Sequence, residues 1–346
     1  MFTDEFFETV RFNCNVSDAK YWGFFSICGL LLRLRELFKV EKALEPWDSI
    51  DNEEIFKWLE EKEKTWQLLK DEEFRPFNLY NEKISPFELE RVNSFLENKG
   101  MVYGAGYAFF MKPSFFVGVI QEKKYIDGYN VYFVGREIVR DLFSSVGMSI
   151  EKTIFIRLIN IRYRVWENLP NWFNVKENLS SHLISIFGSP EKWQYPYPEF
   201  ERIVQKYAQI VFYHEIAEQK IEIKDWDLIK TCKDSKTEHI LRGVRDFLVD
   251  FSSYGPISAA LKNKDKELLI FYILSQGPYQ KKILKKTLLD LKNAILLDDW
   301  QTIEKIRDSE YEKWKNNNEY IFQIYKNQGV DAVKVVANKI FEGELN

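Results

Sequence analysis

The dipeptide Asp127-Gly128 most constrains the fold, because it separates two runs rich in Tyr, Phe and Val, at residues 115–120 and 129–134. Asp-Gly between such runs is typical of a tight β-hairpin, since its turn needs residues that tolerate positive φ. Residues 101–110 have a similar composition and predict a third strand. The sequence therefore predicts a small antiparallel sheet at about residues 101–134.

Helical patterns dominate the rest of the chain. Capping residues and apolar spacings of three and four predict helices at residues 18–40, 86–98, 151–168, 201–222 and 235–250, among others. The predicted fold class is mainly α, a multi-helix globular domain with the small antiparallel sheet inserted. We expect a single main helical domain over residues 1–346. If the chain divides, the proline-rich stretch 189–198 would separate residues 1–188, with the sheet, from a helical part at 199–346.

Composition narrows the class of partner. The 346 residues are 45% hydrophobic, which is enough for a large core, and 49 Lys and Arg against 53 Asp and Glu give a net charge of only -4. This balance disfavours nucleic acid and anionic membranes as partners. The longest apolar run, residues 21–32, is too short to span a bilayer and predicts a buried helix.

The cysteines and the amino terminus bear on location. Cys14, Cys28 and Cys232 lie far apart with no C-x-x-C spacing, which fits a reducing compartment and excludes a cysteine zinc cage within this chain alone. The acidic start shows no secretion signal. We therefore expect a cytoplasmic protein, while its oligomeric state stays open.

The predicted helix at residues 201–222 carries the clearest chemical pattern. His214 and Glu218, one helical turn apart, continue the apolar stripe of Val204, Tyr207 and Val211. Their side chains are therefore expected to point inward. Buried polar groups need partners, so the pair should hydrogen-bond, bind a metal or face a pocket.

A metal site is one interpretation of this helix. The sequence His214-Glu215-x-x-Glu218 resembles the H-E-x-x-H motif with glutamate in place of the second histidine. An i, i+4 pair can bind one divalent zinc or iron ion, with Glu215 beside it as a catalytic base. Asp250, near the carboxyl end of its own helix, is a candidate third ligand. In the alternative interpretation, His214 and Glu218 form a structural pair and Asp250 a salt bridge to an arginine.

A second charged group follows the predicted sheet. A helix is expected to open at Gly135, where Arg136 and Arg140 would form a like-charge pair at i, i+4. Such a pair costs stability, so these residues and Glu137 should have partners on other elements, either structural cross-bridges or a bound anionic ligand. Arg33 and Glu36, on the helix predicted at 18–40, either pair with each other or line the same site.

The chain resembles an uncharacterised family of bacterial proteins in three segments, YWGFFSICGLLLRLRE, GYNVYFVGREIVRD and YHEIAE. The resemblance covers most of the chain. Because no activity is attached to that family, the resemblance implies no catalytic residue and no cofactor.

Two functional hypotheses follow from these patterns. In the first, the protein is an enzyme or binds a small-molecule ligand in a polar pocket around a divalent metal. The pocket would contain His214, Glu218, Arg136 and Glu137, with Arg33, Glu36 and Asp250 as further members. In the second, it is a non-catalytic interaction or scaffold protein in which the same residues hold helices together.

Overall fold

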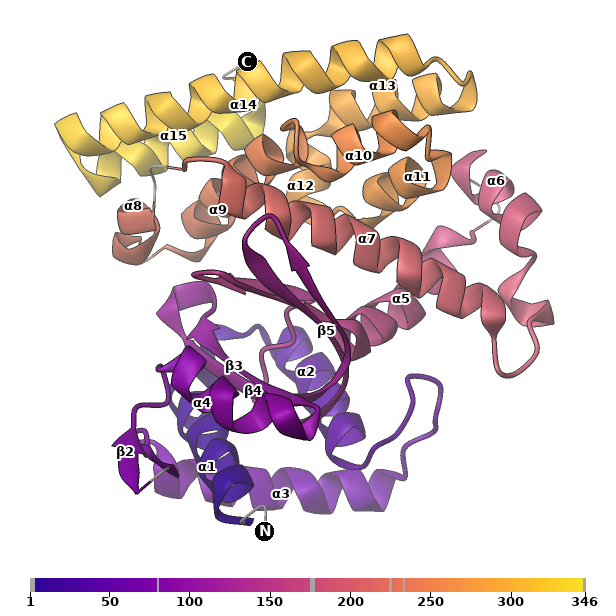
Figure 1. Cartoon of the computed structure of the whole chain (residues 1–346). Coiled ribbons are helices and arrows are strands. Elements are labelled where there is room, and N and C mark those ends of the chain that lie inside the picture. Colours follow the sequence, from indigo (N-terminus) through magenta and orange to yellow (C-terminus); the bar gives the residue numbers. More distant parts are fainter. Residues whose placement is uncertain (1–3, 80, 175–177, 224–225, 233, 345–346) are drawn as a thin grey trace. The chain divides into compact units, whose positions relative to one another are not determined.

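The computed structural model describes residues 4–344 apart from 80, 175–177, 224–225 and 233. The chain separates into two compact units, residues 1–166 and 167–346 (Figure 1). The proline-rich stretch 189–198 lies inside the second unit. The protein is mainly α-helical, and the strands among its described residues belong to the first unit. No described helix combines the length and the apolar content needed to cross a membrane.

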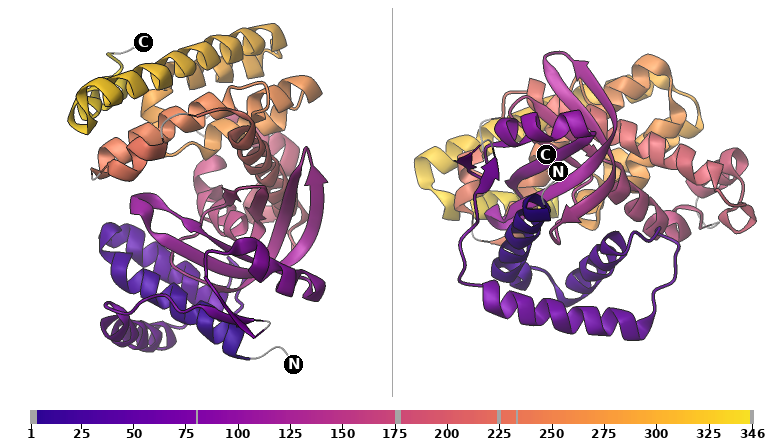
Figure 2. Two further views of the ribbon diagram at one scale, coloured as in Figure 1. Left: turned by 60° about the vertical axis from the view of Figure 1, so that its left-hand side comes forward. Right: turned by 60° about the horizontal axis from the view of Figure 1, so that its bottom comes forward.

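The helices of the first unit pack around a curled sheet (Figures 1 and 2). They are α1 (Asp4–Tyr21), η1 (Trp22–Phe24), α2 (Ile27–Glu41), α3 (Asn52–Leu69), α4 (Leu89–Leu96), η2 (Glu97–Lys99), η3 (Phe109–Met111) and the start of α5 (Leu158–Trp172). The single helix predicted at 18–40 is wrong. Ser17 lies inside α1, and Ser26 caps α2 by accepting a hydrogen bond from the Gly29 amide at 3.1 Å.

The sheet is larger than the small antiparallel sheet that was predicted. It has the order β3-β4-β5-β7-β6 and is mixed, because β7 runs parallel to β5 while the other pairs are antiparallel. Its strands are β3 (Met101–Tyr107), β4 (Pro113–Ile126), β5 (Tyr129–Arg140), β6 (Gly147–Ile150) and β7 (Thr153–Arg157); β1 (Phe77–Leu79) and β2 (Glu82–Ile84) form a separate pair. Asp127 and Gly128, with φ of 52° and 91°, make the predicted two-residue turn.

One predicted helix, and the first part of another, are strands in the structure. β5 continues through Gly135 to Arg140, where a helix was expected, and β7 occupies the first residues of the helix predicted at 151–168. Gly118 of β4 explains part of the difference. A Cβ at this position would lie 2.2 Å from Val134 Cγ1, so glycine allows the two strands to approach closely. Pairing in the sheet therefore overrides the local helical pattern.

A buried lysine links α1 to the sheet. Lys112 Nζ lies 3.2 Å from Asp18 Oδ1 and 3.3 Å from Asp141 Oδ1, and it donates a hydrogen bond to Ser17 Oγ at 2.9 Å. Asp18 also accepts from the Leu142 amide at 3.0 Å. All of these charged side chains are buried, and each has hydrogen-bond partners. The cluster therefore has a structural role, in which it holds α1 to the sheet.

Because of Asp18, the stability of the folded protein should depend on pH. Burial, helped by the charge of Asp141, raises the pKa of Asp18 from 3.8 to about 6, against the opposing effect of Lys112. A raised folded-state pKa contributes stability that is complete below pH 3.8 and is lost as pH rises through about 6. Relative to the variant Asp18→Asn, the wild type should therefore become less stable between pH 4 and pH 7, by up to about 3 kcal/mol.

Urea unfolding of both proteins across this range measures the effect. Glu53→Gln, on the exposed face of α3, controls for a general change in charge. A wild-type-minus-variant difference that stays constant from pH 4 to pH 7 would contradict this account of Asp18.

The second unit is entirely helical in its described residues (Figure 1). Its helices are the end of α5, α6 (Asn178–Phe187), η4 (Pro190–Lys192), α7 (Pro198–Lys220), α8 (Trp226–Thr231), α9 (Ser235–Asp250), α10 (Pro256–Asn263), α11 (Lys266–Ser275), α12 (Pro278–Ile283), α13 (Lys285–Leu296), α14 (Trp300–Gln328) and α15 (Val330–Glu342). Helix α7 packs against α9, α10 and α11, and α14 packs against α9, α13 and α15. This arrangement places the carboxyl-terminal half of α7 beside α9.

Candidate functional site

Helix α7 carries the residues of the candidate site. Its apolar stripe, including Tyr207 and Val211, is buried as the sequence predicts, and Glu215 is also buried. His214 is partly buried, its side chain 24% exposed, and Glu218 is 15% exposed. The imidazole and the carboxylates therefore lie at the edge of the core, where they face α9.

His214 is held by a carboxylate from α9. Its Nδ1 lies 2.7 Å from Asp250 Oδ1. The second oxygen of Asp250 accepts a hydrogen bond from the Tyr272 hydroxyl at 3.1 Å, which connects α11 to the same group. The predicted third ligand, Asp250, thus occupies Nδ1 of the imidazole and orients the ring from behind, as carboxylates behind metal-ligating histidines do.

The other side of the imidazole faces further acids. Asp246 Oδ1 lies 4.0 Å from His214 Nε2. Burial alone would lower the pKa of His214, but Asp250, Asp246 and Glu215 together raise it from 6.5 to about 9. At neutral pH the His214 ring is therefore positively charged, with protons on both nitrogens. A metal ion would have to displace the proton on Nε2.

Glu218 has a partner of its own. Its carboxylate forms an ion pair with Arg245 of α9, a guanidinium whose side chain is 6% exposed. Among the described residues, the cluster contains four carboxylates, on Glu215, Glu218, Asp246 and Asp250. The cationic groups that act on them are this guanidinium, the imidazole and Arg242. Such an excess of negative charge in a partly buried place attracts a cation.

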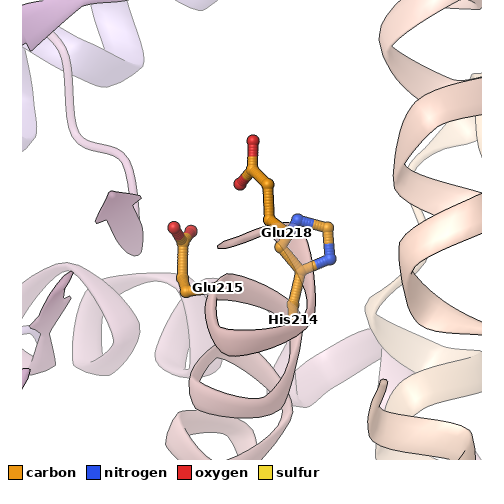
Figure 3. A group of neighbouring side chains, drawn as sticks. All are labelled: His214, Glu215 and Glu218. Carbon is orange, nitrogen blue, oxygen red and sulfur yellow. The ribbon is translucent and has the colours of Figure 1, made fainter. Parts of the chain in front are cut away.

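Three of these residues lie close enough to hold a metal ion. One ligand atom from each of His214, Glu215 and Glu218 lies within 4.8 Å of the others, and this is the group of this kind found among the described residues. Figure 3 shows the three side chains projecting to the same side of one helix. Ligand atoms around zinc lie about 3–4.4 Å apart for bonds of 2.0–2.2 Å, so the group fits one ion after side-chain shifts of about 1 Å.

The first unit holds the other predicted residues in a separate network. Arg157 Nε and Nη2 donate to the two oxygens of Glu137 at 2.5 and 2.9 Å. Arg140 donates from Nη1 to Asn160 Oδ1 at 2.9 Å, and its Nη2 lies 3.6 Å from Glu36 Oε2. The side chains of Arg157, Glu137 and Arg140 have no exposed surface. These charges therefore neutralise one another inside the fold.

Glu36 connects this network to the surface. It accepts hydrogen bonds from Arg33 Nη1 at 2.9 Å and from Ser144 Oγ at 2.8 Å. Burial would raise the pKa of Glu36, but the charges of Arg33 and Arg140 lower it by more. The pKa of Glu36 therefore lies below its usual value, and the carboxylate stays ionised. Arg33 remains 30% exposed. The network is thus built of charge-assisted hydrogen bonds between the sheet and α2.

The structure separates Arg136 from its predicted neighbours. Arg136 is exposed on β5, whereas Glu137 and Arg140 are buried. Sequence reasoning grouped these residues on one helix and missed Arg157, Asn160 and Ser144, which supply the partners. A strand assignment for residues 153–157 would have pointed to Arg157, because parallel pairing places it beside Val134 on β5.

Comparison with protein families covers nearly the whole chain. The model of a family of unknown function, DUF6866, matches in two parts: its N-terminal domain at residues 5–157 and its C-terminal domain at residues 162–343. The chain belongs to the DUF6866 family. No curated protein and no solved structure matches it. The two DUF6866 domains coincide closely with the two compact units, so His214 belongs to the C-terminal DUF6866 domain.

Proposed function

We propose that the C-terminal DUF6866 domain binds one divalent metal ion, such as Zn²⁺ or Fe²⁺, through His214, Glu215 and Glu218. The observation that carries this proposal is the convergence of three ligand atoms within 4.8 Å at the edge of the core. Imidazole with carboxylates is a ligand set that suits zinc and iron. The hydrogen bond to Asp250 supplies the orienting contact that such histidines usually have.

Charge supports the same proposal. Within the part of the chain that the structure describes, the carboxylates of the cluster outnumber its cationic groups, and a divalent ion would reduce that excess. A bound ion would require His214 to give up the proton on Nε2, and it would share the Glu218 carboxylate with Arg245. Asp246, whose side chain is 38% exposed, stays at the rim, where it can accept a proton from a small molecule beside the imidazole.

The metal proposal implies an enzyme or a ligand-binding protein. A zinc ion with three protein ligands keeps a further position for water or a small molecule. Glu215, considered as a base from sequence, is a ligand in this proposal. The reaction class stays open, and small molecules are the proposed partners. The three free cysteines fit a reducing, cytoplasmic location, which forms part of the proposal.

Calorimetric titration of the full chain with Zn²⁺ tests the proposal. The wild type should bind one ion, and Glu218→Gln should weaken binding at least tenfold because an amide oxygen is a poorer ligand than a carboxylate. Glu222→Gln, an exposed acid just beyond α7, is the matched control and should bind as the wild type does. Absence of binding in the wild type, or equal binding in Glu218→Gln, would contradict the metal site.

A second candidate function is a helical scaffold without a metal. It is favoured by the ion pair between Glu218 and Arg245 and by the contact of Asp250 with both His214 and Tyr272, which tie α7, α9 and α11 together. In a scaffold, the loss of His214 lowers the melting temperature by several degrees with or without zinc in the buffer. In a metal protein, the loss of His214 removes the stabilisation that added zinc gives.

A further inference from the structure

Helix η1 and the start of α2 expose several large apolar side chains. Trp22 is 47% exposed, Ile27 80% and Leu31 57%. Phe24 and Leu32 are also exposed, at 56% and 48%. The sequence predicted a buried helix over residues 21–32, and this prediction is wrong for the described structure. We call the surface of Trp22, Phe24, Ile27, Leu31 and Leu32 the α2 patch.

Ile27, Leu31 and Leu32 of the α2 patch lie on α2, and Trp22 and Phe24 lie on η1 just before it. Ile27 and Leu31 are four residues apart, as are Cys28 and Leu32, so each pair lies on neighbouring turns. Leu34 and Phe38 follow Ile27 and Leu31 at i+7, so the apolar stripe of α2 continues along the helix to Leu34, Leu37 and Phe38, which are buried in the core of the first unit. The amino-terminal turns of α2 thus carry apolar side chains that extend beyond this core.

We propose that the α2 patch is the interface between two copies of this chain. The exposed area supports such a pairing. The five side chains expose on the order of 500 Å² of mainly apolar surface on each copy. Two copies pairing through the same patch would bury at most about 1,000 Å² from these side chains alone, which is the size at which specific interfaces begin. Neighbouring residues at the rim add to that area.

Charge supports a second copy over a membrane surface. Arg35, at the carboxyl end of the exposed face, is the cation that lies in line with the patch, and the chain as a whole carries a net charge of -4. Anionic lipid binding needs several cations around the apolar face. An apolar centre with a charged residue at its rim is instead the composition of a protein interface.

Cys28, which lies next to Ile27 in the sequence, provides a reporter beside the α2 patch. It is exposed, while Cys14 and Cys232 are buried, so a thiol reagent reacts first at Cys28. In a two-fold pairing through α2, the two copies of Cys28 approach each other because the same patch forms both sides of the interface. A bismaleimide with a flexible spacer should therefore join two chains covalently.

Sedimentation velocity of the full chain between about 1 and 100 µM tests the proposal. The wild type should form a dimer, and the double variant Ile27→Glu/Leu31→Glu should be monomeric across this range, because two buried charges per copy oppose pairing. Leu297→Glu is the matched control: Leu297 is 78% exposed in the second unit, and its variant should remain dimeric. Helical content by circular dichroism should be unchanged in both variants.

The cross-linking experiment gives an independent result. The bismaleimide should produce a covalent dimer from the wild type, none from Cys28→Ser, and none from Ile27→Glu/Leu31→Glu. A wild type that stays monomeric to 100 µM overturns the proposal, as does a dimer that survives both charged substitutions. A monomer that sediments with phosphatidylcholine vesicles would assign the patch to a lipid surface and would also overturn it.

Discussion

The variant Glu137→Gln should lose about 3–5 kcal/mol of the free energy of unfolding of the first unit. Glu137 is fully buried and holds the guanidinium of Arg157 through both carboxylate oxygens. It also lies 3.9 Å from Arg140 Nε. Removing its charge leaves two buried guanidiniums with Glu36 as the remaining acid, and an unpaired buried charge is strongly destabilising.

Urea unfolding followed by tryptophan fluorescence and circular dichroism measures this loss. Arg136→Gln, the exposed neighbour on β5, is the control and should change the stability by less than about 0.5 kcal/mol. The double variant Glu137→Gln/Arg157→Gln should lose less stability than the two single variants lose in total, because each single change leaves the other side chain without its ion-pair partner. A Glu137→Gln variant as stable as the wild type would show that the buried ion pairs do not hold the sheet to α2.

The second large effect concerns metal binding in the C-terminal domain. His214→Ala should abolish measurable Zn²⁺ binding, because it removes the nitrogen ligand and leaves carboxylates alone. Asp250→Asn should keep the ligands but weaken binding about 10–100-fold, because Asp250 orients the imidazole through Nδ1. This graded order distinguishes a ligand from the residue behind it.

Calorimetry at constant pH measures both affinities, with melting curves in metal-free buffer to show that each variant folds. His239→Ala is the control, since His239 lies outside the cluster, is half-buried, and has its Nδ1 2.7 Å from the Ser235 carbonyl oxygen. Equal affinity in the wild type and in Asp250→Asn would remove the orienting role. Equal affinity in the wild type and in His214→Ala would place the bound zinc elsewhere.

The local patterns of the sequence predicted most helices and the turn of the hairpin. Asp127 and Gly128 form the turn because their positive φ values are set locally. Local patterns could not predict which segments distant in the sequence pair as strands. Residues 136–140 have helical charge spacing but pair with β4, and residues 153–157 pair in parallel with β5. Parallel strands are not joined by a tight turn, so no short sequence motif predicts their pairing.

The candidate site was predictable only on one helix. The spacing of His214 and Glu218 indicated that both face the edge of the core, since that depends on the helix alone. Their partners come from α9 and α11, and no spacing within α7 identifies Arg245 or Tyr272. The apolar run at 21–32 misled for a related reason. Composition predicts burial, but whether a helix face meets the chain's own core depends on the packing of distant elements.

Nitrogen-15 NMR of the histidine side chains tests the metal proposal most directly, because the sequence contains only three histidines. In metal-free protein at neutral pH, His214 should carry protons on both ring nitrogens. With one equivalent of Zn²⁺, its Nε2 should lose the proton and take a metal-bound chemical shift, while Nδ1 keeps its proton towards Asp250. A His214 ring that stays doubly protonated at saturating zinc would contradict a metal site in this domain.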